Sequence, residues 1–397
     1  MTTETTTTFA ETAEREDRFQ LATYKKFPFA AERGRGAWIE TSQGEQYLDL
    51  YGGHAVAGVG HCHPHVVAAI REQAGHLLFY SNMVYSGARA RAAERLVSCA
   101  PAPVTKAFFC NSGTEANENA MRMARLRTRR EKIITFSGSF HGRTADAISA
   151  TALGKYRELG RPNVPGHLFG EFGDIESVVS LADETIAAVM LEPIQSMAGV
   201  RMAEPSFYRR LRELCDERGM LLIYDEVQTG VGRTGSWFFA GGEAGDGIVP
   251  DIITLAKALG SGVPVGACLT TEDMASHIKE NDLGTTFGGG MLAMAAVTAT
   301  LEAIEADGML ENVRAIEQHL REQLAGVKGI ASVRGRGFLL GIEFIEPIAA
   351  SVQKKLLEQR IITGTSSDAR VLRLLPPLCL KGEEADLLIK ALRQVGE

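Results

Sequence analysis

Short apolar runs alternate with helix-like segments between about residues 104 and 270. Five runs are short, rich in apolar residues and bounded by polar ones, as in strands buried on both faces: KAFFC, KIITF, AAVMLEP, LLIYDE and VGACLT. Two segments between them fit amphipathic helices, namely TEANENAMRMARLRT and EPSFYRRLRELCDERG, and the second ends at a glycine. This alternation predicts a mostly parallel sheet covered by helices.

The pattern changes after Gly288. Two long helix-like segments, MLAMAAVTATLEAIEADGML and LENVRAIEQHLREQLAGV, precede IASVRGRGFLLGIEF, which predicts two strands joined by a glycine-rich turn. We therefore expect a disordered tail over residues 1–18, an N-terminal segment of a small domain over 19–60, a large domain over 61–290, and the rest of the small domain over 291–397.

A histidine-rich stretch, GHCHPH, places His61, Cys62, His63 and His65 within five residues. A metal site is one interpretation, but this spacing is a poor match to a tetrahedral cage, and no second Cys/His group is present elsewhere. A glycine and proline turn that leads into the helix PHVVAAIREQAGHLL is the better interpretation. We expect no metal here.

Composition narrows the class of protein. Among 397 residues, 45% are apolar and 23% are charged, which is ordinary for a soluble globular chain with a large core. The net charge of −7 argues against non-specific binding to nucleic acid. No apolar run is long enough to span a membrane, the N-terminus has no secretory pattern, and six scattered cysteines indicate free thiols in a reducing cytosol.

Carboxylates follow two of the predicted strands. MLLIYDEVQTG runs from apolar residues directly into Asp225 and Glu226, and VMLEPIQSMAG leads into Glu192 and Gln195. Ligands of open α/β sheets bind at the carboxyl ends of the strands. Because burying a charge without a partner is costly, we expect a cationic group at the end of the strand that carries Asp225.

A candidate anion site follows KAFFC, where Ser112, Gly113 and Thr114 open a helix. Free N–H groups, hydroxyls and the positive end of the helix dipole can hold a phosphate. The same residues also fit a plain N-terminal cap. The local sequence leaves both interpretations open.

Further candidates are weak one by one. Phe140 and Arg143 follow the strand KIITF and could face a flat ring and a carboxylate, although a core aromatic and a surface arginine are the commoner interpretation. Lys257 follows an apolar run and precedes a glycine-rich turn, so it is a candidate amine nucleophile. Taken alone, it would more often be a solvated lysine.

Together these residues match the needs of pyridoxal 5'-phosphate, which are an amine for its aldehyde, a phosphate cup, an aromatic platform and a carboxylate for its ring nitrogen. A carboxylate at the position of Asp225 raises the pKa of a nearby base by roughly one to three units. The protonated ring is the form that accepts electrons. A pyridinium is therefore the cation that we expect beside Asp225.

Six motifs carry a resemblance to a known family: NSGTEANE, FHGRT, EPIQ, DEVQTGVGRTG, LAKALG and GTTFGG. In this order and spacing they resemble those of the class III pyridoxal-phosphate aminotransferases, from about Tyr24 to the C-terminus. The resemblance implies the α/β fold of aspartate aminotransferase, fold type I, with a mostly parallel seven-stranded sheet in the large domain and a smaller α+β domain. TYKKFP, FHGRT and VLRLLPPL are most similar to acetylornithine and succinylornithine aminotransferases.

The resemblance also implies residue roles. Lys257 would bond to the cofactor aldehyde and shuttle the proton, and Asp225 would pair with the ring nitrogen. The other cofactor contacts would be Ser112, Gly113, Thr114, Phe140, Gln228 and, from the neighbouring subunit of a homodimer, Thr286. The substrate contacts would be Arg143, Thr285, Arg373 and Tyr24. Glu192 and Gln195 would stand behind the site and support it.

Three positions depart from the family pattern. Met197 stands where many relatives carry an acid that pairs with the carboxylate-binding arginine, so Arg373 is expected to be freer. Met291 follows Gly289 and Gly290 in a turn remote from the chemistry. His54 stands where many relatives have an aliphatic residue, and it either contacts the acyl group or is merely packed, the second being favoured.

The activity that this resemblance implies is transfer of the ω-amino group of an N2-acylated ornithine, acetyl or succinyl, to 2-oxoglutarate, in cytoplasmic arginine biosynthesis. Acylation also keeps the product aldehyde from cyclising onto the α-amine. Other donors, such as ornithine or 4-aminobutyrate, remain an alternative. A decarboxylase, an aminomutase or a non-enzymatic protein is a more distant one, and the presence of Lys257 and Asp225 disfavours the last.

Overall fold

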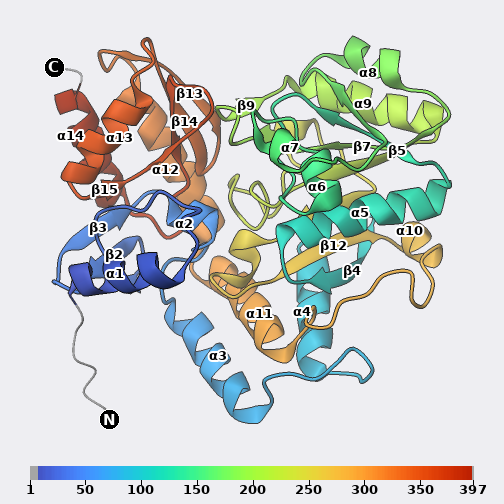
Figure 1. Ribbon diagram of the computed structural model, residues 1–397, viewed down its shortest axis with the longest axis horizontal. Helices are drawn as coiled ribbons and strands as arrows, with labels where there is room; N and C mark the ends of the chain where they lie inside the picture. The colour runs from blue at the N-terminus through green and yellow to red at the C-terminus, as the bar shows by residue number, and fades with distance from the viewer. Residues whose placement is uncertain (1–7, 396–397) are drawn as a thin grey trace.

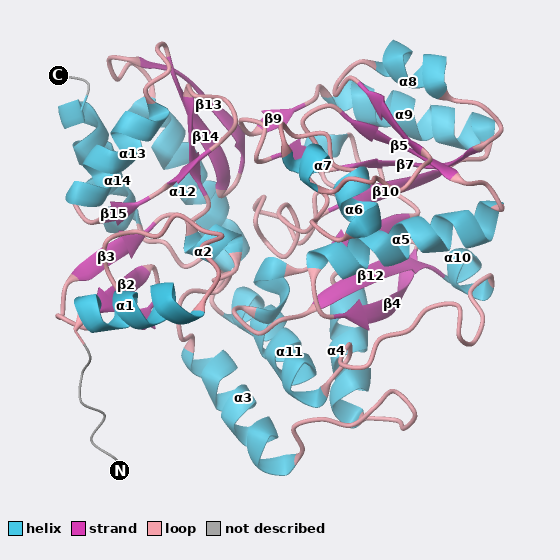
Figure 2. Cartoon of the chain, in the orientation of Figure 1, coloured by secondary structure: helices cyan, strands magenta, loops and turns pink. Residues whose placement is uncertain are grey.

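The computed structural model describes residues 8–395, and its centre is a seven-stranded sheet (Figures 1 and 2). The strand order is β4 (Val104–Cys110), β12 (Gly266–Thr271), β11 (Ile252–Leu255), β10 (Leu221–Asp225), β7 (Ile186–Leu191), β5 (Lys132–Phe136) and β6 (His167–Gly170). β12 is antiparallel to both neighbours and the remaining pairs are parallel. The predicted mostly parallel sheet of fold type I is confirmed.

Helices cover both faces of this sheet, as Figure 1 shows. α5 (Gly113–Thr128) lies against β12, β11 and β7, while α9 (Pro205–Arg218) contacts β10 and α8 (Ile175–Leu181) contacts β6. Ala116, Ala120 and Ala124 recur every four residues on the buried side of α5, which is the spacing of one helix face. Small side chains there allow α5 to approach the sheet closely.

The two ends of the chain share a second body. One sheet combines β1 (Ala31–Arg35), β2 (Trp38–Thr41) and β3 (Gln46–Asp49) with β15 (Ile361–Ile362), which pairs parallel to β3. Another contains β13 (Ile330–Arg336), β14 (Leu339–Phe344), β17 (Val371–Leu374) and β16 (Gly364–Thr365). These sheets are joined by α12 (Met309–Leu324), α13 (Ala349–Glu358) and α14 (Gly382–Val395). The N- and C-terminal segments therefore lie in one body.

Shorter elements complete the described chain. They are α2 (Gly52–Ala55), α6 (Ala145–Ser149), α7 (Tyr156–Leu159), α10 (Glu272–Ser276), the hairpin of β8 (Ile194–Gln195) and β9 (Arg201–Met202), and the 3-10 turns η1 (Glu243–Gly245) and η2 (Lys257–Gly260). The longer helices α3 (Pro64–His76), α4 (Gly87–Ser98) and α11 (Met291–Ala306) pack together. Because α11 packs on these large-domain helices, the domain boundary predicted at residues 290/291 fits better near residue 307.

The prediction of a disordered tail is wrong for residues 9–18, and residues 1–7 lie outside the described range. Helix α1 (Phe9–Phe19) forms there because Thr8 and Glu11 make a capping box. The backbone N–H of Thr8 donates to Glu11 Oε2 at 2.8 Å, and that of Glu11 donates to Thr8 Oγ1 at 3.3 Å. The threonine-rich composition of this segment did not predict the capping box.

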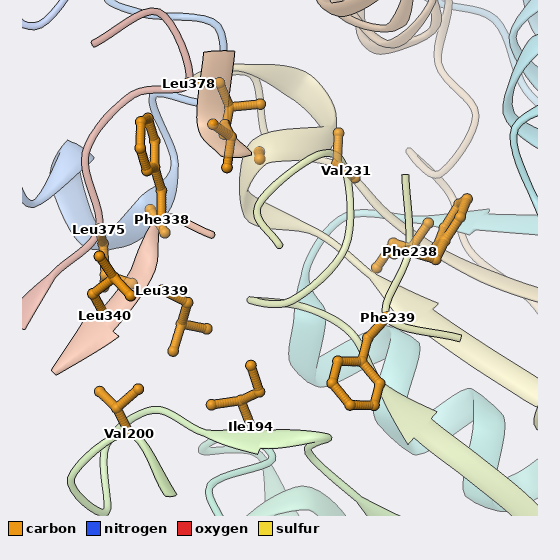
Figure 3. Close-up of a cluster of buried hydrophobic side chains, with 14 of the residues drawn as sticks. Ile194, Val200, Val231, Phe238, Phe239, Phe338, Leu339, Leu340, Leu375 and Leu378 are labelled. Atoms are coloured by element: carbon orange, nitrogen blue, oxygen red, sulfur yellow. The ribbon is translucent and has the colours of Figure 1, made fainter. Parts of the chain in front are cut away.

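The two bodies meet across a buried apolar cluster, shown in Figure 3. Ile194 and Val200 from the large domain face Leu339 and Leu340 from β14, and all four side chains are at most 1% exposed. Arg233 joins the same boundary, since its guanidinium donates to the carbonyl oxygens of Phe338 and Pro376. Close packing of this kind fixes one body relative to the other.

The histidine-rich stretch is tied down by three different carboxylates. His61 lies 2.8 Å from Asp49, while His63 and His65 contact Asp307 and Glu302 on or beside α11, at 3.0 and 2.7 Å. No group of three or more His, Cys, Asp or Glu residues within residues 8–395 is placed to hold a metal ion. All six cysteines are free. None of the described helices has the length and apolarity needed to cross a membrane.

Gly337 offers a test of the domain boundary. Both Gly337 and Gly326 have positive φ, +58° and +80°, but a Cβ at Gly337 would lie 2.4 Å from Arg233 O, whereas one at Gly326 would meet nothing within 4 Å. We expect Gly326→Ala to lower the free energy of unfolding by about 1 kcal/mol through φ alone. Gly337→Ala should cost about 1–3 kcal/mol more because of the clash. Urea unfolding followed by circular dichroism measures both, and equal losses would contradict the packing described.

Candidate active site

A cavity of about 460 Å³ lies at the carboxyl ends of the parallel strands. Segments that are far apart in the sequence supply its walls: the start of α5 and the residues that follow β5, β7, β10 and β11. It brings together these predicted residues: Ser112, Gly113, Thr114, Phe140, Arg143, Glu192, Asp225, Gln228 and Lys257. We call it the inner cavity.

Asp225 is held by three donors at the end of β10. Its Oδ2 accepts from Asn117 Nδ2 at 2.7 Å and lies 2.8 Å from His141 Nδ1, while Oδ1 accepts from the backbone N–H of Val227 at 3.1 Å. Asn117 is itself fixed, because its Oδ1 accepts from Thr254 Oγ1 at 2.6 Å. These contacts stabilise the negative charge of a side chain that is only 4% exposed, and they fix its orientation toward the cavity.

Lys257 enters the same cavity from the turn after β11. Its backbone has φ +42°, a left-handed conformation that is uncommon for a side-chain-bearing residue. Burial lowers the pKa of Lys257 to about 8, and the charges of Asp225 and Glu192 act in the opposite direction. The amine is therefore neutral in a sizeable fraction of molecules near physiological pH, as a nucleophile or base requires.

The start of α5 fits both interpretations that the sequence left open. Ser112 is the N-cap, since its Oγ accepts from the backbone N–H of Glu115 at 3.2 Å. Gly113 and Thr114 in the first turn also line the inner cavity, at the positive end of a 16-residue helix where backbone N–H groups lack intrahelical partners. A Cβ at Gly113 would lie 2.9 Å from Val227 Cγ1, so the close approach there suits glycine.

Glu192 and Gln195 hydrogen-bond the backbone of the segment after β5. Glu192 Oε1 accepts from the backbone N–H of Phe140 at 2.8 Å, and Gln195 Nε2 donates to Ser137 O at 2.9 Å. Burial raises the pKa of Glu192 to about 7, against the effect of His141, which lowers it. These contacts set where the Phe140 ring lies.

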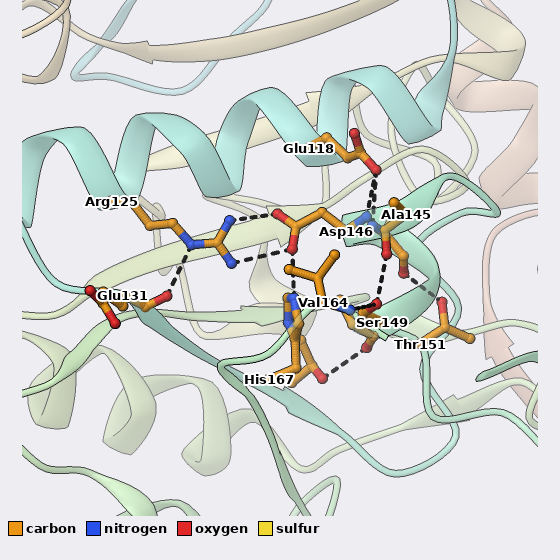
Figure 4. A network of polar contacts seen from close by, with 12 residues as sticks. Glu118, Arg125, Glu131, Ala145, Asp146, Ser149, Thr151, Val164 and His167 are labelled. Carbon is orange, nitrogen blue, oxygen red and sulfur yellow. Dashed lines mark hydrogen bonds and ion pairs between the residues drawn. The ribbon is translucent and has the colours of Figure 1, made fainter. Parts of the chain in front are cut away.

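A polar network fixes the next part of this segment, as Figure 4 shows. Asp146 in α6 pairs with Arg125 of α5 at 2.5 Å and with His167 of β6 at 2.7 Å. Burial opposes ionisation of Asp146, but the hydrogen bonds from His167 and Arg125 outweigh it and lower the pKa of Asp146 to about 2. Glu118 closes the network by accepting from Thr144 Oγ1 at 2.6 Å and from the Asp146 N–H at 2.9 Å.

Tyr156 of α7 is a site residue that the sequence did not reveal. Its ring packs edge-on against Phe140, with centroids 5.4 Å apart, and the Arg143 guanidinium carbon lies 5.1 Å from its centroid. A cation above an aromatic face is attracted to it. Tyr156 thus holds Arg143 beside the inner cavity, and no motif in the sequence points to it.

Arg373 lies in an adjoining cavity of about 1060 Å³, which we call the outer cavity. Its guanidinium donates to Thr365 O at 2.6 Å, Ser196 Oγ at 3.1 Å and Tyr51 OH at 2.6 Å. Among residues 8–395, no Asp or Glu forms an ion pair with it, and Met197 lines the cavity instead. Burial lowers the pKa of Arg373, so an anion from a ligand would be stabilised here.

His54 also lines the outer cavity, with its ring 4.8 Å from that of Tyr51. Burial lowers the pKa of His54, and the charges of Arg373 and Lys257 lower it further. The ring packs against Tyr51 and also lines the cavity. Both interpretations of His54, contact with the acyl group and simple packing, therefore stay open.

Three of the predicted cofactor and substrate contacts line neither cavity. Tyr24 is 73% exposed and does not line either cavity, although Lys25 and Lys26 next to it do. Thr285 Oγ1 accepts from Asn111 Nδ2 and from the N–H of Gly288, both at 3.1 Å, and neither Thr285 nor Thr286 lines these cavities. The roles of these three residues stay predictions.

The inner cavity fits pyridoxal 5'-phosphate. A fixed carboxylate, a half-buried amine, an aromatic ring and a helix N-terminus converge in it. Gln228 Oε1 is buried without a hydrogen-bond partner in the described part of the chain, as expected of a group that receives a ligand donor.

Comparison with known proteins points the same way. The sequence model of the family described as aminotransferase class-III matches residues 20–395. An acetylornithine aminotransferase of Methanopyrus kandleri is 41% identical over 96% of this chain and 97% of its own length. One from Agrobacterium fabrum is 42% identical over 91% of this chain and 92% of its own.

Solved structures agree in fold. An ornithine aminotransferase from Toxoplasma gondii, described with pyridoxal phosphate (PLP) at its active site, superposes with a TM-score of 0.90 and 28% identity, covering 98% of this chain and 93% of the other. Acetylornithine aminotransferase from Elizabethkingia anophelis gives a TM-score of 0.84 at 28% identity, covering 98% of both chains.

The Asp146 network can be tested through stability. Asp146→Asn removes the charge between Arg125 and His167, and we expect it to lower the free energy of unfolding by about 2 kcal/mol at pH 7. A carboxyl whose pKa falls from 3.8 to about 2 on folding stabilises the protein above pH 3.8 and loses that effect as the pH falls toward 2. The difference between the two proteins should therefore shrink below about pH 4.

Urea unfolding between pH 7 and about pH 3 measures this difference on both sides of the expected change. Asp183→Asn is the control, because the Asp183 side chain is solvent-exposed and hydrogen-bonds only its neighbour Thr185 within the described residues. A loss for Asp146→Asn no larger than that of the control would contradict the role assigned to the network.

Proposed function

Since the chain belongs to the class III aminotransferases, which use pyridoxal 5'-phosphate, we propose that it transfers the ω-amino group of an N2-acylated ornithine to 2-oxoglutarate. The products are the N-acylated glutamate semialdehyde and glutamate. Identity of about 40% over nearly the full chain with several proteins named acetylornithine aminotransferase is the observation that carries this proposal.

The cofactor, when bound, supplies an electron sink for the carbon that carries the amine. Lys257 would hold the cofactor through its amine, and once the substrate amine has displaced it, the freed Nζ would take the proton from that carbon and later return it. Burial keeps part of this amine unprotonated, which is the state that can take a proton. Asp225, fixed by Asn117 and His141, holds the ring nitrogen protonated.

Two arginines match the carboxylates of the substrates. Arg143 lies over Tyr156 at the side of the inner cavity, and Arg373 lies in the outer cavity among neutral oxygens. An arginine fork binds a carboxylate through two parallel hydrogen bonds. The dicarboxylate 2-oxoglutarate can engage both arginines, and the donor can engage one through its α-carboxylate.

Free ornithine is the nearest alternative donor. The ornithine and acetylornithine aminotransferase structures both match this chain at 28% identity, so they do not separate the two donors, whereas several sequence relatives at about 40% identity are named acetylornithine aminotransferase. A chemical reason also favours the acylated donor, because a blocked α-amine cannot close onto the aldehyde product. We place the reaction in arginine synthesis in the cytoplasm on this ground.

We further propose a homodimer with shared active sites. Exposed apolar side chains gather where the loop after α3 meets the segment before α11, and the Phe79 and Phe287 rings lie 5.2 Å apart there. Met83 is 92% exposed and Phe287 65%. Thr286, next to Phe287, is exposed beside this patch. An apolar patch of this kind marks an interaction site, and a second copy over it would bring Thr286 to the partner's cofactor.

A donor panel tests the proposed reaction. With 2-oxoglutarate as acceptor, N2-acylornithines should exceed ornithine and 4-aminobutyrate in kcat/KM by at least about tenfold. Borohydride reduction of the native enzyme should leave the cofactor attached to the peptide that contains Lys257. Lys257→Ala should remain folded by circular dichroism and lose measurable turnover. Ornithine as the best donor, or turnover by the lysine variant, would refute the proposal.

The dimer has its own test. Met83→Glu/Tyr85→Glu places two charges in the apolar patch, so we expect a monomer by light scattering and at least about a tenfold loss of turnover. Ile345→Glu is the control, since Ile345 is 62% exposed but lies after β14 in the small domain. A charged-patch variant that stays dimeric and fully active would exclude this surface as the interface.

A further inference from the structure

The outer cavity has apolar walls that no step of the proposed reaction uses. Its lining includes Phe27 and Phe29 from the segment before β1, Leu153 from the loop before α7, Leu357 from α13 and Ile362 from β15. Such walls bury methylene groups favourably and offer nothing to a second polar group. They fit an aliphatic portion of a substrate that extends beyond Arg373.

Four lysines also line this cavity. Lys26 is engaged by Glu16 and Asp17 at 2.8 and 3.1 Å. The side chains of Lys25, Lys155 and Lys354 form no hydrogen bond or ion pair with any residue of the described chain. Three exposed lysines whose side chains have no partner therefore line the cavity, in addition to Arg373.

Little negative charge offsets these cations. Asp49 is the carboxylate that lines the cavity within the described residues, and it is already occupied by His61 and by the N–H groups of Tyr51 and Gly52. The whole chain nevertheless carries a net charge of −7. A local cluster of positive charge on an otherwise acidic protein attracts anions to that cluster. We call Lys25, Lys155 and Lys354 the lysine cluster.

We propose that the outer cavity binds the acyl group of the donor, and that this acyl group ends in a carboxylate of its own. The preferred donor is then an N2-dicarboxylic-acyl ornithine such as N2-succinylornithine. Its methylenes lie along the apolar walls and its terminal carboxylate meets Lys155 and Lys354. This inference rests on the proposed function and decides between the two acyl groups that the sequence left open.

An acetyl group would leave most of this cavity unused. It ends in a methyl, so it has no charge for the lysines, and it lacks the methylenes that fill the apolar part. The lysines are exposed, and an exposed ion pair contributes little on its own. Two lysines acting on one carboxylate, together with the buried methylenes, account for a preference of about tenfold.

The experiment compares kcat/KM of the holoenzyme for N2-succinylornithine and N2-acetylornithine, with 2-oxoglutarate as acceptor. The native enzyme should favour the succinyl donor by about tenfold. Lys155→Met/Lys354→Met should lower kcat/KM for the succinyl donor about three- to tenfold and for the acetyl donor less than about twofold. Lys328→Met/Lys390→Met is the charge-matched control, since both lysines are exposed and neither lines the cavity, and it should change neither value.

The outcomes separate the two proposals. Equal or better use of the acetyl donor by the native enzyme, or an equal loss for both donors in the Lys155→Met/Lys354→Met variant, overturns the inference about the acyl group and leaves the proposed reaction standing. Turnover of neither donor overturns both. Reduction of the succinyl preference by salt in the native enzyme, but not in the double variant, would support the contact with the lysines.

Discussion

The buried carboxylate of Asp225 is the constraint on which the rest of the site depends. A negative charge at the buried end of β10 is tolerated because Asn117, His141 and the Val227 N–H stabilise it. Each of those donors comes from a different segment, so fixing one carboxylate also fixes α5, the segment after β5 and the turn after β10. The same arrangement lowers the freedom of Phe140 and places Lys257 opposite an anion. A single electrostatic requirement thus organises one helix and two loop segments around one cavity.

The substrate side is built differently, because it spans both bodies of the molecule. Arg143 belongs to the large domain and depends on Tyr156, while Arg373 belongs to β17 and depends on Tyr51, Ser196 and the Thr365 carbonyl. The distance between the two arginines is therefore set by the apolar cluster around Ile194 and Leu339 (Figure 3). In the proposed function, packing far from the chemistry then decides which length of dicarboxylate the two arginines can bind together.

The sequence predicts the parts of this structure that follow local periodicity. The buried strands and the long helices can be predicted from that periodicity. The residues after each strand can be predicted as site residues, because the carboxyl ends of parallel strands meet at one edge of the sheet. The role of Tyr156 could not be predicted from the sequence, since it arises from a contact between the loop after β5 and a four-residue helix. Helix α1 was missed because a capping box of two side chains outweighed a polar composition. The lysine cluster of Lys25, Lys155 and Lys354 comes from three segments that are far apart in the sequence, so no local sequence pattern predicts it.

The pairing of β15 with β3 has a consequence for how the chain is made. Residues 46–49 leave the ribosome early, whereas their parallel neighbour at 361–362 is synthesised after just over nine tenths of the protein. The edge of β3 therefore stays unpaired while the large domain, which lies between β3 and β15 in the sequence, is synthesised. Closure of that edge is then a late event that joins the beginning of the polypeptide to its end, and Tyr51 and Arg373 meet across the substrate cavity only once it has occurred.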